Sequence, residues 1–121
     1  MRGVLVSGGS INVVQLKQHI RENDFIVAVD SGLNYLKEID MLPHILIGDL
    51  DSVKEDTLLW SKEKDISILK YPIEKDKTDT EIAIDYLIHK GINEILMFGC
   101  TGTRLDHSLS NISLLRNLDK I

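Results

Sequence analysis

Short segments rich in apolar residues recur along the chain, and each is followed by polar residues and then by a helix-like segment. These apolar segments are predicted strands, and they cover residues 4–7, 25–29, 45–47, 66–71 and 94–98. A strand that is apolar at nearly every position must be buried on both faces, as strands are in a parallel sheet covered by helices. The alternation of strands and helices therefore predicts an α/β fold.

Segments with helical spacing fill the intervals between these strands. They cover residues 12–23, 34–39, 55–64, 78–90 and 105–118. The clearest is 78–90, where Thr78 and Glu81 have the spacing of a capping box and Gly91 follows as a C-terminal stop. We predict a doubly wound, mostly parallel sheet of about five or six strands with helices on both faces, a Rossmann-like three-layer sandwich.

The last predicted helix, over residues 105–118, depends on a single apolar stripe. Its members recur at helical spacing and are Leu105, Leu109, Ile112 and Leu115. This helix would follow a glycine-containing loop and would end close to Ile121.

Composition narrows the classes of protein and partner. A chain of 121 residues, 43% hydrophobic and 27% charged, is expected to form a single globular domain over residues 1–121. The net charge of −5 argues against a nucleic acid partner, because binding of phosphate backbones needs a basic face. Cys100 is the single cysteine, and no stretch approaches the ~20 apolar residues of a membrane span, so we expect a cytoplasmic protein that contacts no membrane.

Polar clusters follow the predicted strands at the point where each strand ends. They are Gly8-Gly9-Ser10, Asp30-Ser31-Gly32, Asp49 with Asp51, Glu74 with Asp76 and Asp79, and residues 99–107. In open α/β sheets, ligands bind at the carboxyl ends of the strands, where parallel strands meet at one edge. The sequence therefore predicts a binding site at that edge.

Two pairs of aspartates at this edge predict a divalent metal site. Asp49 and Asp51 would point the same way on an extended backbone, and their charges would repel unless a cation lay between them. Asp76 and Asp79 flank the start of the predicted helix 78–90. The alternative to metal binding there is that each carboxylate simply caps the N-terminus of the helix. Mg²⁺ prefers carboxylate, phosphate and water oxygens, which both pairs together would provide.

Residues 99–107 form a glycine-containing loop that would lead into a helix. Backbone N–H groups in such a loop suit an anion, and Arg104 adds a guanidinium group that matches phosphate geometry. The loop has neither the Walker A spacing nor the dinucleotide-binding glycine spacing. His107 could be only a structural hydrogen-bonding residue, and Cys100 is interpreted as a small filler. Residue chemistry therefore indicates a metal–nucleotide site without naming the reaction.

Four stretches in this order resemble the bacterial thiamine pyrophosphokinase (thiamine diphosphokinase) family. The stretches are Val29-Asp30-Ser31-Gly32-Leu33-Asn34, Gly48-Asp49-Leu50-Asp51-Ser52, residues 74–81, and residues 99–107 with Asn111 beyond them. Members of this family transfer the β,γ-diphosphate of ATP to the hydroxyl of thiamine, which releases AMP. The resemblance implies an Mg²⁺-dependent enzyme that uses ATP and thiamine as substrates.

The resemblance also implies roles for individual residues. Asp49, Asp51, Asp76 and Asp79 would surround Mg²⁺ and the triphosphate, and Arg104 and Asp106 would lie near the transferring phosphates. These six make up the expected catalytic set. The residues expected to bind the nucleotide are Asp30, Asn34, Gly99, Thr101, Gly102, Arg104 and His107. One carboxylate would orient the thiamine hydroxyl or accept its proton.

The chain departs from the family pattern in sequence and in length. Ser31 and Leu33 stand where many members have glycine and alanine, and Thr103 stands where glycine is common. Family members also carry a C-terminal β-sandwich domain that helps to form the thiamine pocket across a homodimer. The resemblance covers about half of such a protein, so we expect this chain alone to bind Mg-ATP weakly and to turn over little or nothing.

Two other functions also fit part of this sequence pattern. One is a non-catalytic module that binds a magnesium–nucleotide complex. The other is a phosphatase of the haloacid dehalogenase type, because Asp49-Leu50-Asp51-Ser52-Val53 fits its nucleophile loop. That loop should follow the first strand, whereas here it follows the third, and the loop 99–107 would be left without a role.

Overall fold

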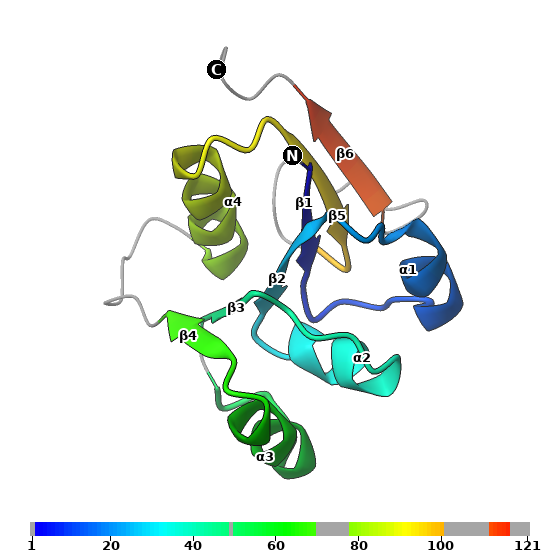
Figure 1. Ribbon diagram of the computed structural model, residues 1–121, viewed down its shortest axis with the longest axis vertical. Helices are drawn as coiled ribbons and strands as arrows, with labels where there is room; N and C mark the ends of the chain where they lie inside the picture. Colours follow the sequence, from blue (N-terminus) through cyan, green and yellow to red (C-terminus); the bar gives the residue numbers. More distant parts are fainter. Residues whose placement is uncertain (1, 49, 70–77, 101–111, 117–121) are drawn as a thin grey trace.

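The computed structural model describes residues 2–48, 50–69 and 78–100, together with the backbone of residues 112–116. Within these residues, six strands form one sheet in the order β4-β3-β2-β1-β5-β6 (Figure 1). The strands are β1 (Arg2–Val6), β2 (Phe25–Val29), β3 (Ile45–Ile47), β4 (Ser67–Leu69), β5 (Glu94–Phe98) and β6 (Ile112–Arg116). The helices are α1 (Val13–His19), α2 (Gly32–Glu38), α3 (Glu55–Glu63) and α4 (Asp79–His89).

Strands β1 to β5 are parallel to one another. Val4 of β1 lies in register between Ile26 of β2 and Leu96 of β5, so β1 occupies the middle of the parallel part. Strands β3 and β4 extend the sheet beyond β2. Because parallel strands share one direction, the five carboxyl ends meet at one side of the sheet, which we call the carboxyl edge. The predicted α/β class and parallel sheet are confirmed.

Two separate apolar clusters cover the two faces of the sheet. Leu5 and Val27 belong to the cluster beneath α4, with Ala83 and Leu87 of that helix. The adjacent residues on the strands face the opposite cluster, which contains side chains of α1, α2 and α3 such as Leu16, Leu33, Leu36 and Leu58. Figure 1 shows α4 on one side of the sheet and the other three helices across from it. Burial on both faces explains why the strands are apolar at consecutive positions.

The ends of α4 follow the signals in its sequence. Thr78 is the N-cap with an extended backbone, and its Oγ1 accepts a hydrogen bond from the Glu81 N–H at 3.2 Å. Gly91 follows the C-cap with a φ of +84°, the left-handed conformation that commonly ends a helix. The predicted cap and the predicted stop are both confirmed.

The predicted helix over 105–118 is wrong for the part that the structure describes. Residues Ile112–Arg116 form β6, which is antiparallel to β5 and pairs Ile112 with Phe98 and Arg116 with Glu94. A short apolar run fits either period, and here pairing along the open side of β5 overrides the helical spacing. The rest of that prediction lies outside the described residues.

Other boundaries differ by a few residues. Helix α1 ends at His19 rather than at residue 23, because Ile20 already has an extended backbone. Helix α2 begins at Gly32 rather than at residue 34. Strand β4 is confined to Ser67–Leu69, and the final two residues of its predicted range lie outside the described part.

A partly buried ion pair links the amino ends of β1 and β2. Arg2 Nη2 lies 2.6 Å from Asp24 Oδ2, and Arg2 Nε donates to Asp24 Oδ1 at 3.0 Å. Asp24, only 5% exposed, also accepts from the Arg21 N–H at 2.8 Å. The side-chain hydrogen bond with Asp24 raises the pKa of Arg2 above its ordinary value, although burial acts in the opposite direction.

Among the described residues, no helix is both long and apolar enough to cross a membrane.

Candidate functional site

The structure describes part of the predicted site. Asp30, Asn34, Asp51, Asp79 and Gly99 lie within the described residues, and all of them follow carboxyl ends of strands or begin helices at that edge. The other predicted site residues lie outside the described residues, and they are Asp49, Asp76, Thr101, Gly102, Arg104, Asp106 and His107.

Asp30 and Asp79 converge over the backbone of Gly48. Gly48 follows β3 with a φ of +110°, and a Cβ built on it would overlap Asp30 Oδ1 and lie 3.1 Å from Asp79 Oδ2. Asp30 follows β2, where its N–H donates to the Ile47 carbonyl at 3.1 Å. Asp79 is the first residue of α4. Two carboxylates that are far apart in the sequence therefore meet at one point of the carboxyl edge, where a glycine leaves room for both.

The electrostatics of this point favour a cation. Two carboxylates so close together repel each other, and a positive ion between them would remove that cost. The partial positive charge at the N-terminus of α4 stabilises the carboxylate of Asp79, which is the first residue of that helix. Asp30 is not part of α4 and is stabilised less by this charge. Asp30 itself has a φ of +51°, a conformation that aspartate tolerates better than most residues and that often marks a functional position.

Asp51 lies in a turn rather than on an extended segment. Strand β3 ends at Ile47, and the Val53 N–H donates to the Leu50 carbonyl at 3.1 Å. The alternation argument made for an extended backbone therefore does not apply at Asp51. Its side chain is exposed, whereas Leu50 packs against the cluster beneath α2 and α3.

Asn34 contacts the loop that carries Asp51. Its Oδ1 accepts a hydrogen bond from the Lys54 N–H at 3.2 Å, which links α2 to the residue that begins α3. Lys37 on the same helix pairs with Asp56 at 3.3 Å. The hydrogen bond from Lys37 is the largest cause that lowers the pKa of Asp56.

Gly99 joins the ends of β1 and β5. Its carbonyl accepts from the Gly9 N–H at 2.8 Å, and the Ser7 N–H donates to the Phe98 carbonyl at 2.9 Å. A Cβ on Gly99 would lie 2.7 Å from Ile11 Cδ1 and 2.9 Å from the Ser7 carbonyl oxygen. The position thus requires glycine for close packing of two loops at the carboxyl edge.

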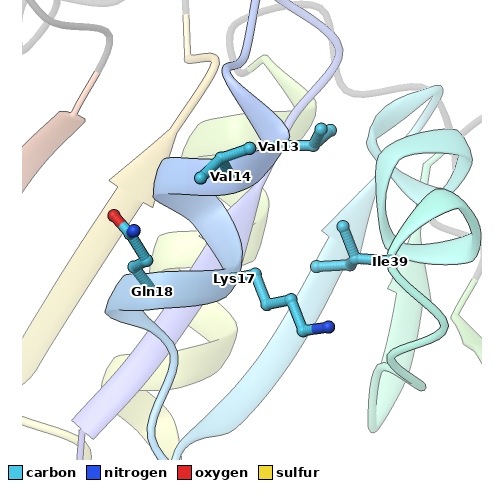
Figure 2. Close-up of a pocket in the computed structure, with 5 residues that line it drawn as sticks. All are labelled: Val13, Val14, Lys17, Gln18 and Ile39. Carbon is cyan, nitrogen blue, oxygen red and sulfur yellow. The ribbon is translucent and has the colours of Figure 1, made fainter.

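A cavity elsewhere contains none of the predicted site residues. It has a volume of about 450 Å³ and lies between α1 and the end of α2. Figure 2 shows Lys17 of α1 extending toward Ile39, with Val13, Val14 and Gln18 completing the lining. The walls are aliphatic and hold no carboxylate, so the cavity is unsuited to a metal–nucleotide complex.

Within residues 2–48, 50–69 and 78–100, no three His, Cys, Asp or Glu side chains are grouped closely enough to hold a metal ion. Two of the four predicted ligands, Asp49 and Asp76, lie outside these ranges. The Asp30–Asp79 pair nevertheless fits Mg²⁺, because this hard ion takes one or two carboxylates and completes its shell with water and phosphate oxygens.

Asp30 was expected from the sequence to contact the nucleotide, and the convergence of its carboxylate with that of Asp79 was not predicted. The available signal was Gly48, since a glycine directly after a buried strand often marks the close approach of another group. The sequence alone could not say which group approaches.

The fold and this edge define a class, namely mostly parallel α/β proteins with an acidic carboxyl edge. The family model for the thiamin pyrophosphokinase catalytic domain matches residues 16–121. The chain belongs to this family.

Relatives and solved structures agree with the family match. Thiamine pyrophosphokinase of Bacillus subtilis (strain 168) is 34% identical over 112 residues, which are 92% of this chain and 52% of the relative. The thiamin pyrophosphokinase structure from Geobacillus thermodenitrificans is 34% identical with a TM-score of 0.68, over 88% of this chain and 50% of that one. The thiamine pyrophosphokinase structure from Bacillus subtilis is 29% identical with a TM-score of 0.71, and the match covers 90% of this chain and 51% of that one. The chain thus spans about half the length of these relatives, and the matches do not favour the phosphatase or the non-catalytic module.

Proposed function

We propose that the carboxyl edge binds a magnesium–ATP complex. The observation that carries this proposal is the convergence of Asp30 and Asp79 over Gly48. Asp49, Asp51, Asp76 and Asp79 would hold Mg²⁺, and Asp30, which meets Asp79 over Gly48, would join them as a further ligand beside the nucleotide. The loop around Gly99, with Thr101, Gly102, Arg104 and His107, would contact the nucleotide and its phosphates.

We further propose diphosphate transfer from ATP to thiamine as the reaction, supported by the family match and by the names of the relatives. The hydroxyl oxygen of thiamine would form a bond to the β-phosphorus, and the bond from that phosphorus to the α,β-bridging oxygen would break. The hydroxyl proton would pass to a carboxylate, and AMP would leave. Bound Mg²⁺ supplies charge neutralisation for the phosphates.

Arg104 and Asp106 complete the proposed catalytic set beside the four aspartates. Arg104 would neutralise charge on the transferring phosphates through its planar guanidinium group. Asp106 would lie near the same phosphates.

The strand order supports a doubly wound, Rossmann-like assignment. Strands β2, β3 and β4 lie on one side of β1, and β5 lies on the other. The nucleotide would then bind in the crevice where the order reverses, between the ends of β1 and β5. We also propose a cytoplasmic homodimer for the full-length protein, since the family forms its acceptor site between two subunits.

A thermal shift assay tests the proposed binding. Saturating Mg-ATP should raise the melting temperature of the chain, and Asp79→Asn should remove most of that rise. Asp40→Asn is the matched control, because Asp40 is an exposed aspartate after the C-terminal end of α2, whereas the N-terminus of that helix lies at the site, and asparagine tolerates the Asp40 φ of +54°. A melting temperature unchanged by Mg-ATP, or an equal rise in Asp79→Asn, would reject the site.

Incubation with thiamine, ATP and Mg²⁺ tests the proposed reaction. The small turnover expected of this chain alone should give AMP and thiamine diphosphate in equal amounts, and omission of thiamine should stop AMP formation. ADP and inorganic phosphate as the products would indicate a different transfer.

A further inference from the structure

The acidic loop between β3 and α3 needs structural support, because it carries Asp51 and connects to Gly48. At its far end, Val53 is 7% exposed and packs into the cluster beneath α2 and α3. The Val53 N–H donates to the Leu50 carbonyl and closes the turn around Asp51. These contacts join the loop to itself and to the apolar cluster that it covers. They do not connect its polar backbone to a neighbouring helix.

Asn34 supplies a tie from a neighbouring helix. Its Oδ1 accepts from the N–H of Lys54, which is the N-cap residue of α3. In a capping box, a Glu or Gln three positions into the same helix accepts this N–H. The corresponding residue of α3 is Thr57, and the acceptor comes from α2 instead.

Lys37 forms a second tie from the same face of α2. It is three residues after Asn34, so both side chains face α3. Its pair with Asp56 joins the first turn of α3, but Asp56 is largely exposed, and such surface pairs contribute little. Of these two ties, the Asn34 hydrogen bond joins the chain nearer in sequence to Asp51.

We propose that Asn34 is a positioning residue, whose carboxamide oxygen holds the acidic loop in the place where Asp51 can bind the metal. This inference rests on the proposed magnesium site. It differs from the sequence-based expectation that Asn34 contacts the nucleotide, because the role belongs to the oxygen and requires no ATP.

Two substitutions separate these roles. Asn34→Ala removes the acceptor for the Lys54 N–H, whereas Asn34→Asp keeps an acceptor oxygen and removes the NH₂ group. Mn²⁺, used alone as a stand-in for Mg²⁺, can be titrated by electron paramagnetic resonance without nucleotide. Asn93→Ala is the control, since Asn93 is an exposed asparagine just before β5, at the opposite edge of the sheet.

The expected result is an about threefold to tenfold loss of Mn²⁺ affinity in Asn34→Ala, the range of one lost hydrogen bond. Affinity should be retained in Asn34→Asp and in Asn93→Ala. In hydrogen–deuterium exchange, the Lys54 amide should exchange faster in Asn34→Ala and not in Asn34→Asp. Equal Mn²⁺ affinity in Asn34→Ala and the unsubstituted chain, or equal losses in both Asn34 variants, would overturn the inference.

Failure of the metal proposal would have a different signature. If the unsubstituted chain binds no Mn²⁺, the magnesium site is rejected, and the exchange rate of the Lys54 amide alone decides whether Asn34 holds the loop. Unchanged exchange in Asn34→Ala would then overturn the positioning role as well.

Discussion

Replacement of Gly48 by alanine should damage the site much more than the fold. Gly48 has a φ of +110°, and Gly91, after α4, has a φ of +84°. Both are backbone conformations that residues other than glycine adopt only with strain. A Cβ on Gly91 meets nothing within 4 Å, whereas a Cβ on Gly48 overlaps Asp30 Oδ1 and lies 3.1 Å from Asp79 Oδ2. Gly91→Ala is therefore a control with backbone strain and without a clash at the site.

The two expected magnitudes follow from these contacts. Backbone strain should lower the free energy of unfolding by about 1–3 kcal/mol in each variant. The added clash in Gly48→Ala falls on the end of an aspartate side chain, which can rotate away at little cost. Asp30 Oδ1 must then move by more than roughly 1 Å to reach an ordinary contact distance. Metal–oxygen bonds tolerate only about 0.2 Å, so Mn²⁺ affinity should fall by at least about tenfold.

Denaturant unfolding and Mn²⁺ titration on both variants provide the assay. We expect similar losses of stability in Gly48→Ala and Gly91→Ala, and a loss of metal affinity in Gly48→Ala alone. Unchanged Mn²⁺ affinity in a folded Gly48→Ala protein would refute the argument that Asp30 and Asp79 meet at a metal site.

Three further predictions concern stability and titration. Asp24→Ala should lower the free energy of unfolding by about 3 kcal/mol in urea titration, because it leaves the guanidinium of Arg2 without its buried partner. Thr78→Ala should cost about 1 kcal/mol in the same measurement, since the N-cap acceptor of α4 is lost; no change would mean that the cap is unimportant. Lys37→Met should raise the pKa of Asp56 in an NMR titration. Because that pKa is lowered in the folded chain, the small stabilising effect of the pair is present at neutral pH and is lost as the pH falls through the acidic range. If the pKa of Asp56 is the same in Lys37→Met and in the unsubstituted chain, the contact is absent in solution.

The fold followed from sequence wherever local and tertiary requirements agree. Ile45–Ile47 is apolar at each position because β3 is buried on both faces, and this property is visible in the sequence. Thr78 and Gly91 set the ends of α4 through contacts within a few residues. Such features depend on nearby residues only, so the sequence reveals them.

Features that depend on distant neighbours were not predictable in the same way. Ile112–Arg116 forms a strand because β5 offers it a pairing partner, whereas its spacing also fits a helix. The meeting of Asp30 with Asp79 depends on the placement of β2 beside β3 and on the entry of α4 above Gly48. Asn34 likewise contacts Lys54 across two elements. The sequence indicated the edge and its residue types, but not these pairings.

Isothermal titration calorimetry of ATP tests the central claim most directly. The account predicts saturable binding of ATP to the chain in the presence of Mg²⁺ and loss of that binding when EDTA removes the metal. Equal binding with Mg²⁺ and with EDTA, or no binding under either condition, would contradict a magnesium–nucleotide site at the carboxyl edge.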